Sequence, residues 1–333
     1  MINTDLRIIS MMDWLENDLL MIINSCEIAS SDASFRRYFR IISEQCSYIV
    51  MDAPPEKENI AQFLKVAKFF SAYDINVPNI YQQNREDGFL LLEDFGSECL
   101  LDKLNTQTVA GLYQIACDEL YKIQSQIDIS LIDLPSYDEA FFQRELLLFQ
   151  EWFLNGLLDL DVPILLWDKV RRILVTSALE QPVVCVHRDY HSRNLMYLGL
   201  NSVGVIDFQD AVLGPITYDV VSLLKDCYIT WSESMIENWM SDYYLRLIKA
   251  DLIDCSLNDF KRWFDLMGMQ RHLKAIGIFA RLHLRDGKSS YLQDIPRTLN
   301  YIKNVCANYA EIEEWGAYLE SQVLPRFEGY LLS

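Results

Sequence analysis

The chain has 333 residues, of which 51% are hydrophobic and 23% are charged, so it has enough apolar material for one large domain or two modest ones. It carries 29 basic and 48 acidic residues, a formal net charge of −19. This balance argues against a nucleic-acid-binding protein, which needs a basic surface, and against docking on anionic membranes. The acidic excess favours solubility, and attraction of cationic substrates is the weaker explanation.

Eight cysteines are spread along the chain, and no two of them form a Cys-x-x-Cys pair, so neither a zinc site nor a redox motif is predicted. The first 18 residues contain acids where a signal peptide would carry its apolar core, and no apolar run approaches the length of a membrane span. We therefore expect a cytoplasmic protein.

The first hundred residues mix strand and helix patterns. Apolar spacing, polar turns and proline positions indicate where each element begins and ends. The predicted elements are, in chain order, a helix over residues 6–23, a polar turn at 30–34, a strand containing Phe35, a strand over 47–53, an amphipathic helix over 56–75 and a hairpin over 77–96.

Helical patterns dominate after residue 100. They cover residues 106–127, 137–159, 163–180, 216–230, 233–250, 257–284 and 296–322, and strand-like stretches lie only at 183–186, 194–198 and 203–206. This order predicts an α+β fold. Residues 1–95 would form a small N-terminal lobe, a sheet with a helix. Residues 96–333 would form a larger, mainly helical lobe, beyond a hinge near Glu93–Ser97.

The stretch HRDYHSRN, residues 187–194, follows the apolar run PVVCV and places polar groups at the end of a buried strand. Asn194 lies five residues after Asp189, and Asp207 ends a further strand. This order is typical of phosphoryl transfer by kinases, in which one aspartate orients the acceptor hydroxyl and an asparagine and a second aspartate bind magnesium. The alternative is a structural loop in which Asp189 and Asn194 are turn formers.

The stretches HRDYHSRNLMYL and VIDFQDAVLGPITYDVVSLL resemble the C-terminal lobe of aminoglycoside phosphotransferase-type kinases, a family that includes choline kinases, and LLLEDFG resembles their hinge. Three further stretches, SSDASFRRYFRI, YIVMDAPPEKEN and MGMQRHLKAIGIFARLHLRDGKSSYLQDIPR, resemble the branch that phosphorylates N-acetylmuramate and N-acetylglucosamine at the anomeric position. The resemblance covers roughly residues 30–325 and implies a two-lobed protein-kinase-like fold. It also implies that residues 1–95 are the nucleotide-binding lobe and residues 96–333 the catalytic and sugar-binding lobe of one phosphotransferase domain.

The resemblance also implies roles for individual residues. Asp189 would be the catalytic residue, a base that orients the hydroxyl, while Asn194 and Asp207 would hold Mg²⁺. His187 and Asp219 would support the catalytic loop. The residues implied in ATP binding are Ser31, Asp32, Ala33, Ser34, Phe35, Arg37, Glu93 and Phe95.

Two departures from the family pattern stand out. The phosphate loop has no glycine, because Ser31 stands where the sugar kinases would carry one. The strand SYIVMD has no lysine where kinases place the one that pairs with the α- and β-phosphates, and Met51 or Asp52 occupies that neighbourhood. The candidates for the missing charge are Arg36, Arg37, Arg40 and Lys57, although Arg36 and Arg37 also fit a solvated strand face.

Three residues are candidates for sugar binding. We hypothesise that Arg271 or His272 reaches a substrate oxygen, such as the lactyl carboxylate of muramic acid, while pairing of Arg271 with one of the many acids is the alternative. Arg193 and His191 lie inside the catalytic loop and can face either substrate or protein; for His191 we favour a structural role.

The function favoured by these observations is ATP-dependent phosphorylation of the C1 hydroxyl of N-acetylmuramate and N-acetylglucosamine, which feeds peptidoglycan precursor recycling. ATP and Mg²⁺ are the expected cofactors, and we expect a monomer without nucleic-acid or membrane partners. The alternatives are an aminoglycoside or choline-type kinase and, from another class, a nucleotide-binding pseudokinase that acts as an interaction module because it lacks the lysine.

Overall fold

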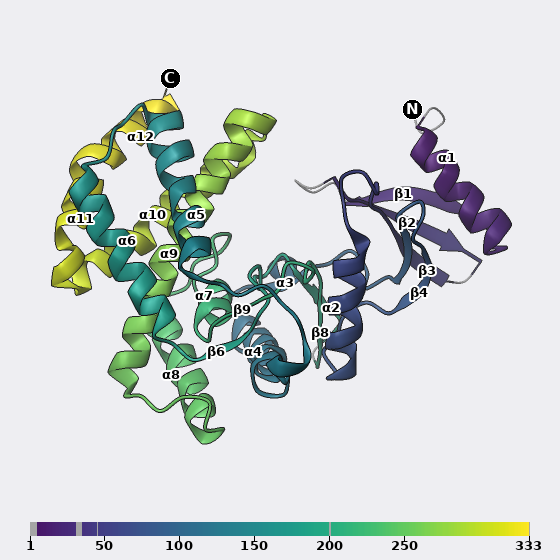
Figure 1. The fold of residues 1–333 in the computed structure, drawn as a ribbon, viewed down its shortest axis with the longest axis horizontal. Coiled ribbons are helices and arrows are strands. Elements are labelled where there is room, and N and C mark those ends of the chain that lie inside the picture. Colours follow the sequence, from purple (N-terminus) through teal and green to yellow (C-terminus); the bar gives the residue numbers. More distant parts are fainter. Residues whose placement is uncertain (1–4, 31–34, 45, 200, 333) are drawn as a thin grey trace. The chain divides into compact units, whose positions relative to one another are not determined.

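A computed structural model describes residues 5–30, 35–44, 46–199 and 201–332 of the chain. The chain divides into two compact units, whose elements are labelled in Figure 1. The first unit comprises Met1–Glu119 and Arg193–Asp210, and the second comprises Leu120–Ser192 and Ala211–Ser333.

The first unit is built on a five-stranded antiparallel sheet with the order β1-β2-β3-β5-β4. The helix α2 (Ile60–Ala72) turns Phe63 and Phe70 toward the ring of Phe208, with ring centroids 4.8 and 5.9 Å apart. The predicted amphipathic helix and the predicted hairpin are confirmed. The strands are β1 (Ser25–Ser30), β2 (Arg37–Ser43), β3 (Cys46–Asp52), β4 (Ile80–Asn84) and β5 (Phe89–Glu93).

The N-terminal segment differs from the prediction. The helix α1 (Leu6–Asp13) continues as a single π-helical stretch to Asp18, and Leu20 then adopts a left-handed backbone with φ of 55°. The helix therefore ends earlier than residue 23, and the strand β1 that follows was not predicted. Its side chains are mostly exposed, so it lacks the buried alternation by which a strand is recognised.

A second, two-stranded ribbon of the first unit consists of β7 (Leu195–Tyr197) and β8 (Val203–Val205). The amide of Val205 donates to the carbonyl of Asn76 at 2.7 Å, and the amide of Tyr197 donates to the carbonyl of Glu98 at 2.9 Å. These bonds tie the ribbon to the chain on both sides of the expected hinge. The division into compact units therefore differs from the expected boundary at residues 95 and 96: α3 (Leu100–Lys103), most of α4 (Val109–Ser125) and the ribbon belong to the first unit.

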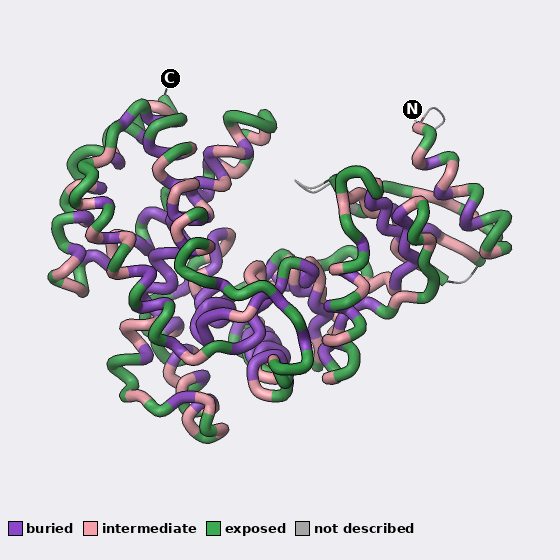
Figure 2. Tube along the Cα trace, in the orientation of Figure 1, coloured by how far each residue is buried: buried purple, intermediate pink, exposed green. Residues whose placement is uncertain are grey.

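The second unit is mainly helical and is organised around α9 (Leu257–Asp286), a 30-residue helix whose middle is almost entirely buried (Figure 2). Gly277 allows the close packing, because a Cβ atom there would lie 2.4 Å from the backbone carbon of Leu148. The other helices are α5 (Glu139–Leu148) with its π-helical continuation Phe149–Leu157, α6 (Ile164–Leu179), α7 (Tyr218–Leu224), α8 (Glu233–Lys249), α10 (Ile295–Asn308), α11 (Glu313–Tyr318) and α12 (Leu324–Leu332).

Two strands complete the second unit, β6 (Val183–Val186) and β9 (Val212–Pro215), which pair antiparallel. The strand β6 matches its prediction, whereas β9 was missed. The predicted helix over residues 296–322 is divided, because Tyr309 has an extended backbone between α10 and the turns that lead to α11. Within the described ranges, none of the helices combines the length and apolarity that a bilayer crossing requires.

Candidate active site

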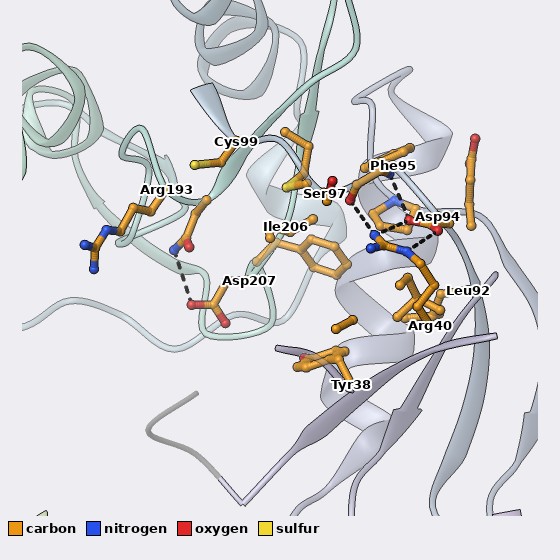
Figure 3. A pocket seen from close by; sticks show the side chains of 18 of the residues that line it. Tyr38, Arg40, Leu92, Asp94, Phe95, Ser97, Cys99, Arg193, Ile206 and Asp207 are labelled. Atoms are coloured by element: carbon orange, nitrogen blue, oxygen red, sulfur yellow. Dashed lines mark hydrogen bonds and ion pairs between the residues drawn. The ribbon is translucent and has the colours of Figure 1, made fainter. Parts of the chain in front are cut away.

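The first unit contains a cavity of about 280 Å³ (Figure 3). Its lining comes from the sheet, from the segment after β5 and from the β7–β8 ribbon. A cavity whose lining combines apolar residues with a few polar ones suits a small planar ligand. The apolar lining residues include Ala29, Ile49, Leu92, Met196 and Ile206.

The segment after β5 is braced by Arg40 of β2. The Arg40 guanidinium donates to both carboxylate oxygens of Asp94, at 2.7 and 2.9 Å, and to the carbonyl of Gly96 at 2.8 Å (Figure 3). Burial alone would raise the pKa of Asp94, but the hydrogen bonds from Arg40 and Ser47 hold that pKa below its ordinary value. The segment is therefore held by a charged pair and not by backbone pairing alone.

Glu93 and Phe95, two of the predicted ATP-binding residues, both line this cavity. The ring of Phe95 lies against Gly204 of β8, where a Cβ atom would come within 2.3 Å of the ring. The Glu93 carboxylate accepts a hydrogen bond from the Asn79 side chain at 2.6 Å. The side chain of Glu93 is thus engaged, and its amide donates to the carbonyl of Asn79 at 2.9 Å.

The other predicted ATP contacts are placed differently. Ser31, Asp32, Ala33 and Ser34 lie outside the described residues. Phe35 is exposed, with the Lys57 ammonium 4.6 Å from its ring, and does not line the cavity. Arg37 is bound by the carboxylates of Asp52 and Asp5 and also lies outside the lining. The geometry therefore gives no support to a nucleotide contact by Arg37, whose charge is used within the protein.

Asn194 precedes β7 and Asp207 follows β8, so the antiparallel ribbon brings both residues to the same end, where they lie side by side in the cavity lining. The Asn194 side-chain amide donates to one oxygen of Asp207 at 3.3 Å, and Gln209 donates to the other at 2.8 Å. Asp207 has a left-handed backbone with φ of 63°, an uncommon conformation that marks functional sites when the surroundings enforce it.

The donor set of this pair fits magnesium. The part of the chain that the structure describes holds no group of three or more His, Cys, Asp and Glu side chains suited to a metal. Magnesium does not require one, because it usually takes one or two protein oxygens and completes its shell with water and substrate phosphates. The Asp207 carboxylate and the side-chain amide of Asn194, which are adjacent because the amide nitrogen donates to the carboxylate, would supply one carboxylate oxygen and one amide oxygen.

In the second unit, the loop after β6 is held by Asp219 of α7. One oxygen of this fully buried carboxylate accepts the amide of His187 at 2.6 Å, and the other accepts the amide of Arg188 at 3.0 Å. Burial raises the pKa of Asp219 to about 6 despite these bonds. Arg188 has φ of 77°, and the His187 ring accepts the amide of Asp189 through Nδ1 at 3.3 Å. Both predicted supporting residues thus contact the loop that carries Asp189.

A buried carboxylate that the sequence did not reveal, Glu145 of α5, lies beneath this loop. Its carboxylate forms ion pairs with Arg188 at 2.9 Å and with Lys274 at 3.1 Å. It also accepts hydrogen bonds from the side-chain amide of Gln270 at 3.2 Å and from the hydroxyl of Tyr137. Burial would raise the pKa of Glu145, yet Lys274 and Arg188 hold it below its ordinary value. An isolated glutamate inside a helix pattern gives no signal of such partners, which come from distant parts of the chain.

Asp189 lines a second cavity, of about 120 Å³, which belongs to the second unit. Burial would raise the pKa of Asp189, but Lys274 and His191 lower it to about 2, so the group is a carboxylate at neutral pH. Asp226, also missed in the sequence, lines the same cavity and accepts both the amide and the hydroxyl of Ser192, at 2.9 and 2.5 Å. A second buried carboxylate therefore holds the far end of the loop.

The three predicted sugar-binding residues are separated by the structure. Arg271 is only 6% exposed and lines the cavity with Asp189; among the described residues its Nε and Nη1 atoms have no hydrogen-bond partner. His272 does not line that cavity: its Nε2 lies 2.8 Å from the carbonyl oxygen of Lys225, and its ring stacks on Tyr301. Arg193 is exposed and belongs to the lining of the first unit's cavity.

The first unit combines a sheet with a cavity that an ion pair braces, and the second unit holds its loop with buried carboxylates. These features are those of a kinase-type phosphotransferase. Solved structures share the fold at low identity. An ADP-bound aminoglycoside phosphotransferase, APH(2'')-Ib, has a TM-score of 0.59 with 15% identity and covers 89% of this chain and 97% of its own. A choline kinase from Streptococcus pneumoniae has a TM-score of 0.64 with 13% identity, covering 90% and 99%. The expected two-lobed protein-kinase-like fold is confirmed.

The sequence relatives are more similar. The model of the phosphotransferase enzyme family matches residues 25–250. A protein named N-acetylmuramate/N-acetylglucosamine kinase from Pseudomonas putida is 43% identical over 327 residues, covering 94% of this chain and 95% of the relative. A protein of the same name from Pseudomonas aeruginosa is 45% identical over 297 residues, covering 88% and 87%. The chain therefore belongs to the phosphotransferase enzyme family.

The burial of His272 predicts a pH dependence of stability. Burial lowers the pKa of His272 to about 3, whereas an unfolded histidine has a pKa of about 6.5. Between these values the unfolded chain binds the proton and the folded chain does not, so stability falls as the pH falls below about 6.5. This group alone should cost about 2 kcal/mol of unfolding free energy between about pH 7.5 and about pH 5.

Urea unfolding at the two pH values would measure the loss. His272→Gln keeps a donor for the Lys225 carbonyl and should remove this part of the pH dependence, while His283→Gln, at the less buried end of the same helix, should leave it unchanged. Equal pH dependence in the wild type and in His272→Gln would show that the histidine is not held neutral.

Proposed function

We propose that the chain is an ATP-dependent kinase that phosphorylates the anomeric C1 hydroxyl of N-acetylmuramate and N-acetylglucosamine. The products would be sugar 1-phosphates that feed peptidoglycan precursor recycling. The observation that carries the proposal is similarity over most of the chain, at 43% and 45% identity, to proteins named N-acetylmuramate/N-acetylglucosamine kinase. The geometry of the two cavities supports it.

ATP binding is proposed for the first unit. The base would enter the cavity of this unit beside Glu93 and Phe95, which line it. Asn194 and Asp207 would hold Mg²⁺, which would neutralise part of the negative charge of the phosphates. Gln209 would keep the Asp207 carboxylate in place through its 2.8 Å hydrogen bond.

Asp189 is proposed to orient the acceptor hydroxyl. Since the pKa of Asp189 is about 2, the carboxylate is ready to accept a hydrogen bond but is too weak a base to remove a hydroxyl proton early. This suits the loose transition state of phosphoryl transfer, in which the proton leaves late. The C1 oxygen bonds to the γ-phosphorus as the bond to the ADP oxygen breaks, and the hydroxyl proton passes to Asp189 and then to water.

The sugar is proposed to bind in the cavity of the second unit. Among the described residues, the Nε and Nη1 atoms of Arg271 have no hydrogen-bond partner, and a buried unsatisfied donor is costly unless a ligand uses it. The lactyl carboxylate of N-acetylmuramate matches a guanidinium in charge and in geometry. N-acetylglucosamine has no such group, so Arg271 would favour the acidic sugar.

Other proposals rest on the sequence alone. A sugar contact by Arg193 stays a prediction, as do the loop Ser31–Ser34 over the phosphates and the division of labour between a nucleotide lobe and a sugar lobe. We also propose that the protein is a monomer and that it acts in the cytoplasm.

A coupled ADP-release assay with magnesium and ATP tests the function. N-acetylmuramate and N-acetylglucosamine should release ADP, whereas kanamycin and choline should not. Asp189→Asn should lower kcat by at least about 100-fold, because the acceptor loses its negatively charged partner. Turnover of kanamycin or choline alone would contradict the sugar assignment, and silence with all four would favour the pseudokinase.

Arg271→Gln tests the specificity. It should raise KM for N-acetylmuramate about 10- to 100-fold, because the variant loses a hydrogen bond to a charged group. It should change KM for N-acetylglucosamine by no more than about threefold. Arg262→Gln is the matched control, since Arg262 lies on the same helix but pairs with Glu311 outside the cavity. Equal losses for both sugars would show that Arg271 does not recognise the carboxylate.

A further inference from the structure

The second unit contains a further cavity, of about 300 Å³, which residues of α8, α9 and α10 line and which is called the α10 cavity below. It shares no lining residue with the cavity that contains Asp189. Its buried part is apolar and includes the indole of Trp231, which is 9% exposed. Apolar walls with an aromatic ring and a few polar groups are the usual lining of a small-molecule site. The other buried apolar residues of the lining are Ile236, Met240, Phe264 and Val305.

The charged side chains of the α10 cavity mostly pair with one another. The Lys225 ammonium donates to one oxygen of Asp265 at 2.7 Å, and the other oxygen of Asp265 accepts the hydroxyl of Tyr309 at 2.9 Å. Lys261 forms an ion pair with Glu237. A charged ligand would have to displace one of these partners, at the cost of leaving a charge unpaired. The lining therefore suits a ligand without charge.

Three asparagines of α10 line the cavity at intervals of four residues, namely Asn300, Asn304 and Asn308. Because residues four apart lie on one face of a helix, their side-chain amides form a row along the cavity. The amide of Asn304 donates to Glu233 of α8 at 2.8 Å and so ties the two helices together. Asn300 and Asn308 are exposed, and their side chains form no hydrogen bond with any other residue that the structure describes.

This row of amides is unfavourable for the helix, which indicates that it serves another purpose. Asparagine is less favourable than alanine inside a helix, because its side chain competes for backbone hydrogen bonds. Asn300 and Asn304 lie inside α10, where lysine or glutamate would keep the face equally polar and favour the helix more. An amide offers an acceptor oxygen and two N–H donors, so it matches ligand groups that both donate and accept, such as hydroxyls.

We propose that the α10 cavity binds an uncharged saccharide, such as a glycoside of an acetylated amino sugar, at a site separate from the Asp189 cavity. The apolar face of the sugar ring would contact Trp231, and its hydroxyl and acetamido groups would pair with Asn300 and Asn308. The inference goes beyond the proposed function, since this site requires neither ATP nor a free C1 hydroxyl.

NMR spectroscopy of the full chain tests the proposal. The probe is the methyl glycoside of N-acetylglucosamine, whose blocked C1 oxygen cannot be phosphorylated. The indole N–H signals are followed during a titration, and Trp231→Phe identifies the signal of Trp231 by its loss. This signal should shift in a saturable manner when the glycoside is added, because the indole lies in the lining.

Variants of α10 assign the binding to this cavity. Asn300→Ala should weaken glycoside binding about 3- to 10-fold, because one hydrogen bond is lost. It should also raise the urea midpoint of unfolding, because alanine favours the helix, so a loss of binding could not be ascribed to unfolding. Asn238→Ala is the matched control, since Asn238 is an exposed asparagine of α8 outside the lining, and it should leave the affinity within about twofold.

Two results would overturn the inference. One is a Trp231 signal that does not move when the glycoside is added. The other is a shift with the same midpoint in the wild type, Asn300→Ala and Asn308→Ala, which would place the glycoside elsewhere in the protein. Neither result bears on ADP release from ATP, so the proposed function would stand or fall by its own assay.

Discussion

The arrangement of the second unit depends on buried carboxylates that must be neutralised within the protein. A charge removed from water is tolerated only when partners and hydrogen bonds compensate it. Glu145 is compensated by Arg188 and Lys274, and Asp219 by two consecutive amides of the loop after β6. Because these partners belong to the loop or to the cavity beside it, compensation of the charges also fixes the position of Asp189.

The same compensation operates in the first unit. Arg37 pairs with Asp52 and Arg40 pairs with Asp94, and these pairs hold the sheet and the segment after β5. The acidic composition of the chain supplies carboxylate partners for both arginines.

The sequence predicted the elements that carry the candidate site residues, and His187 and Asp219 as supports of the loop, but not the buried carboxylates Glu145 and Asp226. The strand before the HRD loop, the hairpin after it and the strand-end Asp207 are local patterns, so their positions could be predicted. The partners of Glu145 and Asp226 come from segments far apart in the chain and have no local signature. The strands β1 and β9 were missed for a related reason: β1 is largely exposed, and β9 contains the Gly-Pro pair that usually marks a turn.

Residue roles were predicted less well than elements. Arg37 was expected to face ATP because arginine suits phosphate. However, its cross-strand neighbour on β3 is Asp52, and the two side chains form an ion pair within the protein. His272 lies beside Arg271 in sequence but, on a helix buried all round, packs against Lys225 and Tyr301 instead of lining the Asp189 cavity. Adjacent residues on such a helix face different neighbours, and only the tertiary packing decides which one faces a ligand.

The central claim is that phosphate is transferred to the anomeric oxygen of an acetylated amino sugar. Phosphorus–proton correlation NMR of the product formed from N-acetylglucosamine, magnesium and ATP tests it most directly. The account predicts coupling between phosphorus and the proton on C1, with loss of the reducing end. Coupling to the protons on C6, with the reducing end retained, would contradict it.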